Sequence, residues 1–301
     1  MKRFILNLFI VVLVALGLLG GLVRLTYVVE FSALKAELSI PTNQVAVVVG
    51  DSHVEVLFDD GELPWLRNFG LSGMPFEATA KKAKLLVECN PHLQLMVIDI
   101  WPTEFFMPNQ PFGPGAPYGV ALFEMYDRED MPPMGDDFIV RLAHGVVNPG
   151  LSRLVLGKGQ NQLLGGFKPR NESLMNNKWG NAETYESLEK FNLEREPAHM
   201  EKVLENLIVW MQEHKVNLVL TTTPLYRTYR EHGYTPEANG YFISRMEAIA
   251  KKHKVPWLNW LYEYQDNPEC WADGNHLNSL GVKAFLRDHG PTLKSFLTKA
   301  D

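Results

Sequence analysis

A serine, a histidine and an aspartate have the types and spacing that catalyse acyl transfer. Ser52 follows Gly50 and Asp51 at the end of an apolar run. Asp273 and His276 lie three residues apart, a spacing that lets the carboxylate accept a hydrogen bond from Nδ1 of the imidazole. Nε2 is then left to take the serine proton. The residues therefore favour Ser52 as nucleophile, His276 as base and Asp273 as its orienting partner.

Acyl transfer also needs donors for the oxyanion that forms on the attacked carbonyl. The N–H of Ser52 is one candidate. The N–H of Gly70, in Asn-Phe-Gly-Leu-Ser-Gly at 68–73, is a second, because a glycine permits close approach of the substrate. Asp51 is expected to accept hydrogen bonds from turn amides, and Asn275 to support the turn that carries the base. No metal or cofactor is expected, since serine acyl transfer requires neither.

Two other interpretations of the 50–53 turn are open. Gly-Asp-Ser after a strand is ordinary turn chemistry and could have no catalytic role. Asp51 and His53 could instead begin a metal site with Gly-Asn-His at 274–276. A two-metal site needs a further aspartate segment and further histidines, and only His289 follows 274–276. The metal interpretation is therefore the weakest of the three.

The elements that must position these residues alternate between strand and helix. Strands are predicted at 44–49, 64–68, 93–100, 216–222 and 255–258, and helices at 77–89, 199–214, 236–252 and 279–297. The alternation predicts an α/β fold, with a parallel sheet and helices on both faces. Ligands bind such sheets at the carboxyl ends of the strands, where Ser52 stands.

The N-terminus has the length and composition of a membrane span. Residues 4–23 are apolar except for Asn7 and three glycines, and Lys2 and Arg3 precede them. A helix needs about 20 such residues to cross a bilayer, more than the roughly 7–15 apolar residues in the hydrophobic region of a signal peptide. We expect an uncleaved anchor over 1–27, with a cleavable signal as the alternative. The leading cations predict a cytoplasmic N-terminus, with a stalk at 28–43 and a domain at 44–301 in the periplasm or exterior.

The domain contains a long insertion, and the net charge of the chain argues against nucleic acid as a partner. Residues at about 107–196 are rich in Pro and Gly and weakly patterned, apart from a helix expected near 137–147. An insertion of this length is typical of a lid or substrate wall. The chain has 29 Lys and Arg against 35 Asp and Glu and no basic cluster, which argues against nucleic acid. Its two cysteines, Cys89 and Cys270, are weak evidence for a disulfide.

Three segments resemble blocks of the SGNH/GDSL hydrolase superfamily. Gly-Asp-Ser at 50–52, the 68–73 segment and Asp-Gly-Asn-His at 273–276 are similar to blocks one, two and five. The resemblance implies a three-layer α/β/α sandwich and the roles given above to Ser52, Gly70, Asp273 and His276. Block three differs from the family pattern, because Trp-Pro-Thr-Glu stands at 101–104 in place of Gly-x-Asn-Asp. The Asn of that pattern is an oxyanion donor. Thr103 is the candidate replacement, and losing one donor can cost about 10²–10³-fold in rate.

With its expected anchor, its insertion and its altered block three, the chain is similar to a membrane-tethered subgroup of SGNH-like proteins. That subgroup includes alginate acetyltransferases and the D-alanyl transfer protein of teichoic acid synthesis, which work beside a membrane-bound O-acyltransferase. The resemblance implies a serine-dependent ester hydrolase or acyl (acetyl) transferase. Its substrate would be a cell-envelope glycan or other acylated molecule outside the cytoplasmic membrane. The alternative is a catalytically weak protein of this fold that binds glycan or scaffolds an acylation complex.

Overall fold

The computed structural model describes residues 38–102 except Pro75, 165–171, 198–227, 230–231 and 236–297, with single positions between 4 and 36. The chain divides into two units, Met1–Leu38 with Gln110–Leu163, and Ser39–Asn109 with Leu164–Asp301. The account below concerns the second unit. Within the described residues, no helix is long and apolar enough to cross a membrane. Most of the expected anchor, the helix expected near 137–147 and most of the insertion lie outside the described residues.

Five parallel strands form one sheet in the order β2-β1-β3-β4-β5. Their bounds are β1 Ala46–Val49, β2 Leu66–Asn68, β3 Leu95–Asp99, β4 Asn217–Thr222 and β5 Trp257–Asn259. Every residue of β1 and β3 is buried. Strands covered on both faces need apolar side chains at consecutive positions, which explains the unbroken apolar runs. The predicted strands and their parallel arrangement are confirmed, with small shifts at the strand ends.

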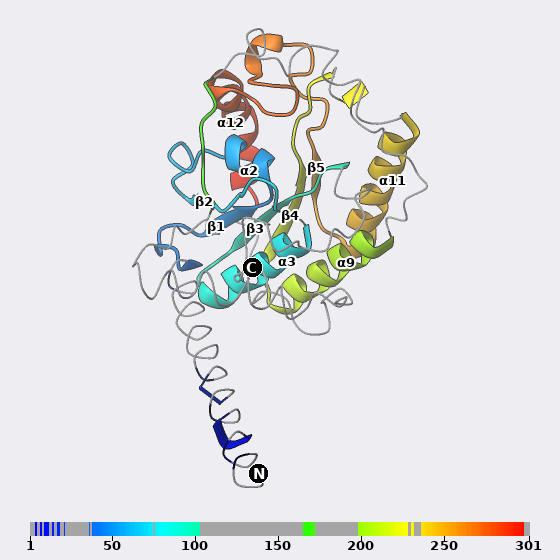
Figure 1. Ribbon diagram of the computed structural model, residues 1–301. Coiled ribbons are helices and arrows are strands. Elements are labelled where there is room, and N and C mark those ends of the chain that lie inside the picture. The colour runs from blue at the N-terminus through cyan, green and yellow to red at the C-terminus, as the bar shows by residue number, and fades with distance from the viewer. Residues whose placement is uncertain are drawn as a thin grey trace. The chain divides into compact units, whose positions relative to one another are not determined.

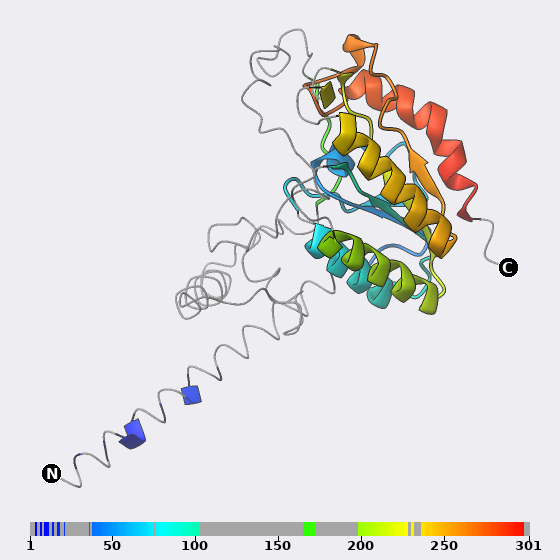
Figure 2. The same cartoon turned by 90° about the vertical axis from the view of Figure 1, so that its right-hand side faces the viewer.

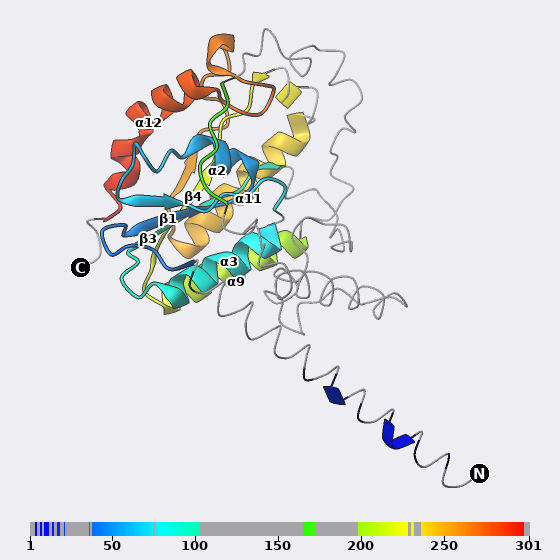
Figure 3. The same ribbon diagram turned by 60° about the vertical axis from the view of Figure 1, so that its left-hand side comes forward.

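Helices cover both faces of the sheet (Figures 1 and 3). One face carries α3 Phe76–Cys89, α9 Ala198–Glu213 and α11 Pro236–His253, which pack in series. The other carries α2 Ser52–Leu57 and α12 Ser279–Lys294. Figure 2 shows the sheet between α12 and the pair formed by α3 and α9. The second unit is therefore a three-layer α/β/α sandwich, as expected.

The strand order places the first strand at a switch point. From β1 the chain moves out to β2, then returns past β1 to β3 and continues to β4 and β5. Connections leave β1 and β3 in opposite directions, and such a point opens a crevice at the carboxyl ends of the strands. The residues after β1 at this end are Gly50, Asp51 and Ser52.

A short helix begins where the sequence predicts only a turn. Asp51 is the N-cap of α2, and its carboxylate accepts a hydrogen bond from the His53 N–H at 2.9 Å. Val54 and Leu57 of this helix are buried in the same apolar cluster as Val48 and Phe285. Burial of that face fixes the helix against the sheet and holds its first residue, Ser52, at the end of β1.

Candidate active site

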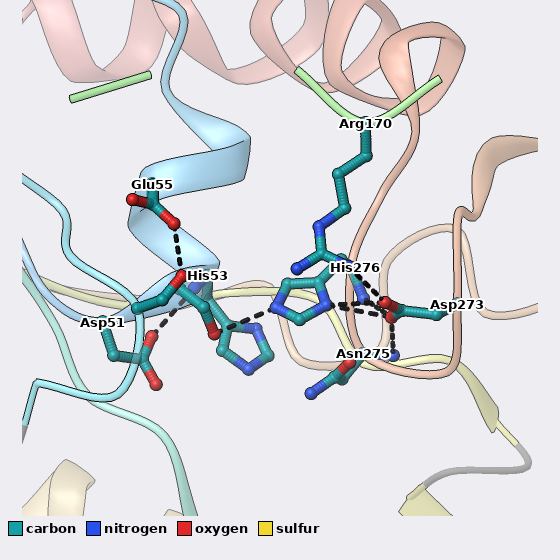
Figure 4. A network of polar contacts seen from close by, with 9 residues as sticks. Asp51, His53, Glu55, Arg170, Asp273, Asn275 and His276 are labelled. Carbon is teal, nitrogen blue, oxygen red and sulfur yellow. Dashed lines mark hydrogen bonds and ion pairs between the residues drawn. The ribbon is translucent and has the colours of Figure 1, made fainter. Parts of the chain in front are cut away.

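The structure brings the three predicted catalytic side chains together. Ser52 Oγ lies 2.9 Å from Nε2 of His276, although 224 positions separate the two residues in the chain. His276 Nδ1 lies 2.9 Å from each carboxylate oxygen of Asp273. Asp273 and His276 are buried, whereas Ser52 is partly exposed. Figure 4 shows the His276 imidazole beside the Asp273 carboxylate. With Ser52 on the other imidazole nitrogen, this is the arrangement of a nucleophile, a general base and its orienting acid.

The base and its acid share one tight turn. The N–H groups of Asn275 and His276 donate to Oδ1 of Asp273 at 3.0 and 2.8 Å. The Ala272 N–H donates to the His276 carbonyl at 2.9 Å, which closes the turn. Asn278 then caps α12 by accepting from the N–H groups of Leu280 and Gly281. Asn275 thus contributes to the turn through its backbone N–H.

Arg170 is a site residue that the sequence does not reveal. One guanidinium nitrogen donates to Oδ2 of Asp273 at 2.8 Å. Burial acts to raise the pKa of Asp273, but its hydrogen bond with His276, the charge of His276, the Asn275 N–H and the charge of Arg170 together lower it. Asp273 is therefore ionised at neutral pH. Arg170 lies in the weakly patterned insertion, where no spacing links it to an aspartate 103 positions later.

The expectation that Gly70 supplies an oxyanion donor is wrong in this structure. Its N–H donates to Oδ1 of Asn68 at 2.7 Å. Nδ2 of Asn68 in turn donates to the carbonyls of Val54 and Phe58 in and beside α2, so this side chain joins the 68–73 loop to the nucleophile helix. The glycine is needed here for a reason other than substrate approach. A Cβ at position 70 would lie 2.3 Å from the backbone nitrogen of Glu55.

Gly70→Ala is expected to destabilise the fold by about 1–3 kcal/mol, the usual cost of overpacking. The neighbour that must move is backbone of α2, which cannot rotate aside. Urea denaturation measures the effect. Gly240→Ala is the matched control, because nothing lies within 4 Å of a Cβ there and alanine favours the helix. A Gly70→Ala protein as stable as wild type would show that α2 and the 68–73 loop are not packed as described.

Among the described residues, the Ser52 N–H is the predicted oxyanion donor that stays available. It lies in the first turn of α2, where amides have no acceptor within the helix. Thr103 lies outside the described residues.

His53 is fully buried, and its ring centroid lies 4.2 Å from that of Trp101 and 5.1 Å from that of His276. Burial lowers the pKa of His53 well below its usual value, so its ring is neutral.

Two buried carboxyl groups lie behind the nucleophile. Burial raises the pKa of Asp51 to about 6, against opposing hydrogen bonds that include one from Trp101. Burial and the charge of Asp51 raise the pKa of Asp99, at the end of β3, to about 8. Hydroxyl groups of Thr221 and Thr223, each 3.0 Å from a carboxyl oxygen of Asp99, only partly offset this rise. Asp99 is therefore mostly protonated at neutral pH.

Asp99→Asn is expected to remove one contribution to the pH dependence of stability, namely a fall in the free energy of unfolding as the pH rises. The pKa of Asp99 rises from 3.8 to about 8 on folding, so the unfolded chain loses this proton first as pH increases. The free energy of unfolding therefore falls between about pH 4 and about pH 8, by up to about 1.4 kcal/mol per pH unit for one such proton. Asparagine does not titrate, so the Asp99→Asn protein lacks this contribution to the slope of the free energy of unfolding against pH.

Urea denaturation at several pH values between about 6.5 and about 8 measures the difference in slope between wild type and Asp99→Asn. Asp51 contributes mainly below that range, and the buried Lys82, whose pKa is lowered to about 7, adds the same opposite slope to both proteins. Ser244→Ala, an exposed change that removes no titrating group, is the control. Equal slopes in wild type and Asp99→Asn would contradict the prediction.

Comparison with solved structures finds a likeness to the crystal structure of a candidate acylhydrolase from Bacteroides fragilis. The two chains are 12% identical, the TM-score is 0.44, and the alignment covers 90% of this chain and 98% of that chain. No protein-family model matches the chain, and no curated protein sequence does.

Proposed function

We propose that the chain is an SGNH-type, serine-dependent ester hydrolase or acyl transferase. One observation carries this proposal: Ser52 Oγ lies 2.9 Å from Nε2 of His276, whose Nδ1 lies 2.9 Å from both oxygens of Asp273. The direction of these contacts suits proton transfer from serine to imidazole. The buried, ionised Asp273 then stabilises the imidazolium that forms.

The proposed reaction proceeds through an acyl-enzyme. Ser52 Oγ attacks the ester carbonyl carbon while its proton passes to Nε2 of His276, and the carbonyl electrons form an oxyanion near the Ser52 N–H. Collapse of this intermediate breaks the ester C–O bond, and the leaving alcohol takes the proton from His276. Water or an acceptor hydroxyl then repeats these steps on the acyl-serine. Water gives an esterase and a sugar hydroxyl gives a transferase.

A cell-envelope glycan or another acylated molecule is the proposed substrate. The apolar run at 4–23, preceded by Lys2 and Arg3, supports a single-pass anchor in the cytoplasmic membrane, with the catalytic domain in the periplasm or exterior. A membrane-bound O-acyltransferase is the proposed acyl donor partner, by the resemblance to tethered SGNH-like proteins. Retention of the full chain in carbonate-washed membranes, and protease access from outside the cytoplasm, test this location.

A second candidate is a glycan-binding or scaffold protein of weak catalytic power. The occupied N–H of Gly70 favours it, because the loss of one oxyanion donor lowers rates about 10²–10³-fold. Against it, a binding protein has no need for a serine within proton-transfer distance of an oriented histidine.

Covalent labelling of the serine tests the proposal directly. The purified full-length chain is treated with a fluorophosphonate, which reacts with activated serines, and peptide mass spectrometry locates the adduct. We expect the adduct on Ser52. Turnover of p-nitrophenyl acetate with uronate or chito-oligosaccharide acceptors then separates the two reactions, since acetylated oligosaccharide indicates a transferase and free acetate alone an esterase. No adduct and no turnover, with retained oligosaccharide binding, would favour the second candidate.

A further inference from the structure

A short segment of the insertion is bonded to three parts of the site. The segment is Gly-Gly-Phe-Lys-Pro-Arg-Asn at 165–171. The Gly166 N–H donates to the carbonyl of Gly70 at 3.0 Å, and the Lys168 N–H to the carbonyl of Glu55 at 2.8 Å. The Ser279 N–H donates to the carbonyl of Arg170 at 2.9 Å. The 165–171 segment thus joins the 68–73 loop, α2 and the start of α12.

The sequence of this segment fits its close approach to the loop. Gly165 has φ +63, a left-handed conformation that favours glycine, and a Cβ there would lie 1.9 Å from the carbonyl oxygen of Gly70. At the other end, the Ser279 hydroxyl lies 2.6 Å from Oδ1 of Asn171. Contacts at both ends hold Arg170 in place above the site.

Arg170 completes the bonding of the catalytic carboxylate. Oδ1 of Asp273 accepts the two backbone N–H groups of its own turn, and Oδ2 accepts the guanidinium at 2.8 Å. Both oxygens therefore have a donor besides the imidazole, so the carboxylate cannot rotate without breaking a hydrogen bond. Figure 4 shows the Arg170 side chain descending beside His276 to reach Asp273. Its side chain is 34% exposed, so solvent reduces but does not remove its charge effect.

Among the described residues, few charged or titratable groups face the His276–Asp273 pair. From α2 they are Asp51 and His53, and from the 165–171 segment Arg170. His53 is neutral, and the neighbouring cation Lys168 is paired with Glu55. The positive charge of Arg170 therefore opposes addition of a proton to the pair, and acts against the negative charge of Asp51.

We propose that Arg170 is a positioning residue for the catalytic pair, which fixes the Asp273 carboxylate and moves the acid limb of the activity profile to lower pH. The inference rests on the proposed function, because it concerns the same histidine and aspartate. It gives part of the insertion a direct chemical role, since a residue far from the three blocks in sequence sets the geometry and charge of the base.

The test compares the fluorophosphonate labelling rates of full-length variants as a function of pH. Arg170→Met is expected to react about 10- to 100-fold more slowly at its optimum, the worth of one hydrogen bond to a charged group. The acid limb of its labelling profile is expected to move to higher pH by about one unit, the size of a charge effect that solvent partly screens. Arg170→Lys keeps the charge, so its limb is expected to stay near the wild-type position while the rate falls in part.

Arg67→Met is the matched control, because it removes an arginine from a 3.0 Å ion pair with Asp60 in β2 and its loop. We expect Arg67→Met to change neither the labelling rate nor the pH at which the acid limb lies. A slower Arg170→Met with an unmoved acid limb would overturn the proposal, since a merely structural role predicts that result. An unchanged rate would overturn it as well.

A second measurement separates this inference from the proposed function. The low-field proton NMR signal of the His276 Nδ1–H reports its hydrogen bond to Asp273 whether or not Ser52 reacts. We expect the signal to shift in Arg170→Met and to stay in place in Arg67→Met. If wild type is not labelled at Ser52, the proposed function fails while this signal still tests Arg170. An identical signal in Arg170→Met and wild type would overturn the positioning role.

Discussion

Ser52→Ala is expected to reduce ester turnover by about 10⁴- to 10⁶-fold, the range seen when a catalytic serine is removed. The Ser52 hydroxyl is the group placed 2.9 Å from the imidazole nitrogen that would accept its proton. Without it, water must attack the ester with no covalent intermediate. The measurement is kcat/KM for p-nitrophenyl acetate, with the purified variant at the same concentration as wild type.

The same variant is expected to remain folded. Among the described residues, its lost hydroxyl has one hydrogen bond, to His276, and a single such bond contributes about 1 kcal/mol. Ser244→Ala is the matched control and should leave turnover unchanged, since within the described part of the chain that hydroxyl bonds only a carbonyl of its own helix. If Ser52→Ala kept more than a tenth of wild-type activity, the ester would be reacting at another nucleophile and the proposed site would be wrong.

The parts of the fold and site that the sequence predicts are those set by local patterns. The strands around Val48 and Val97 lie buried on both faces, so each appears as an unbroken apolar run. The Asp273–His276 pair belongs to one turn, so its spacing alone indicates that the carboxylate can reach the imidazole. The meeting of Ser52 with His276 then follows from the parallel sheet, which gathers strand ends at one edge.

The parts that the sequence does not predict depend on contacts between distant segments. Gly70 looks like a donor in the sequence, but its N–H is taken by Asn68, whose amide also bonds carbonyls of the nucleophile helix. The pKa of Asp99 depends on burial and on the charge of Asp51 across the sheet. The pairing of Arg170 with Asp273 needs the path of an insertion that has no periodic pattern. In each case the deciding partner is set by tertiary packing.

Asp273→Asn is expected to lower kcat/KM by about 10⁴-fold, although the side chain changes by one atom. Oδ1 of Asp273 accepts two backbone N–H groups, so the amide oxygen of asparagine should take that position. The amide NH₂ then replaces Oδ2, where it faces Arg170 and Nδ1 of His276. The oxygen at the Oδ1 position also lies 2.9 Å from Nδ1, but it already accepts the two backbone N–H groups. A donor in that place favours the imidazole tautomer with its proton on Nε2, which cannot accept the serine proton.

This predicted loss comes from the tautomer, and two comparisons separate it from a general loss of structure. Asp60→Asn removes a carboxylate from another arginine pair, 3.0 Å from Arg67, and is expected to leave turnover unchanged. The Nδ1–H signal of His276 is expected to disappear from the low-field proton NMR spectrum of Asp273→Asn and to persist in Asp60→Asn. A loss of less than 10-fold in Asp273→Asn would mean that the carboxylate only orients the ring. The larger loss would mean that the charge and acceptor geometry of Asp273 set the protonation state on which attack by Ser52 depends.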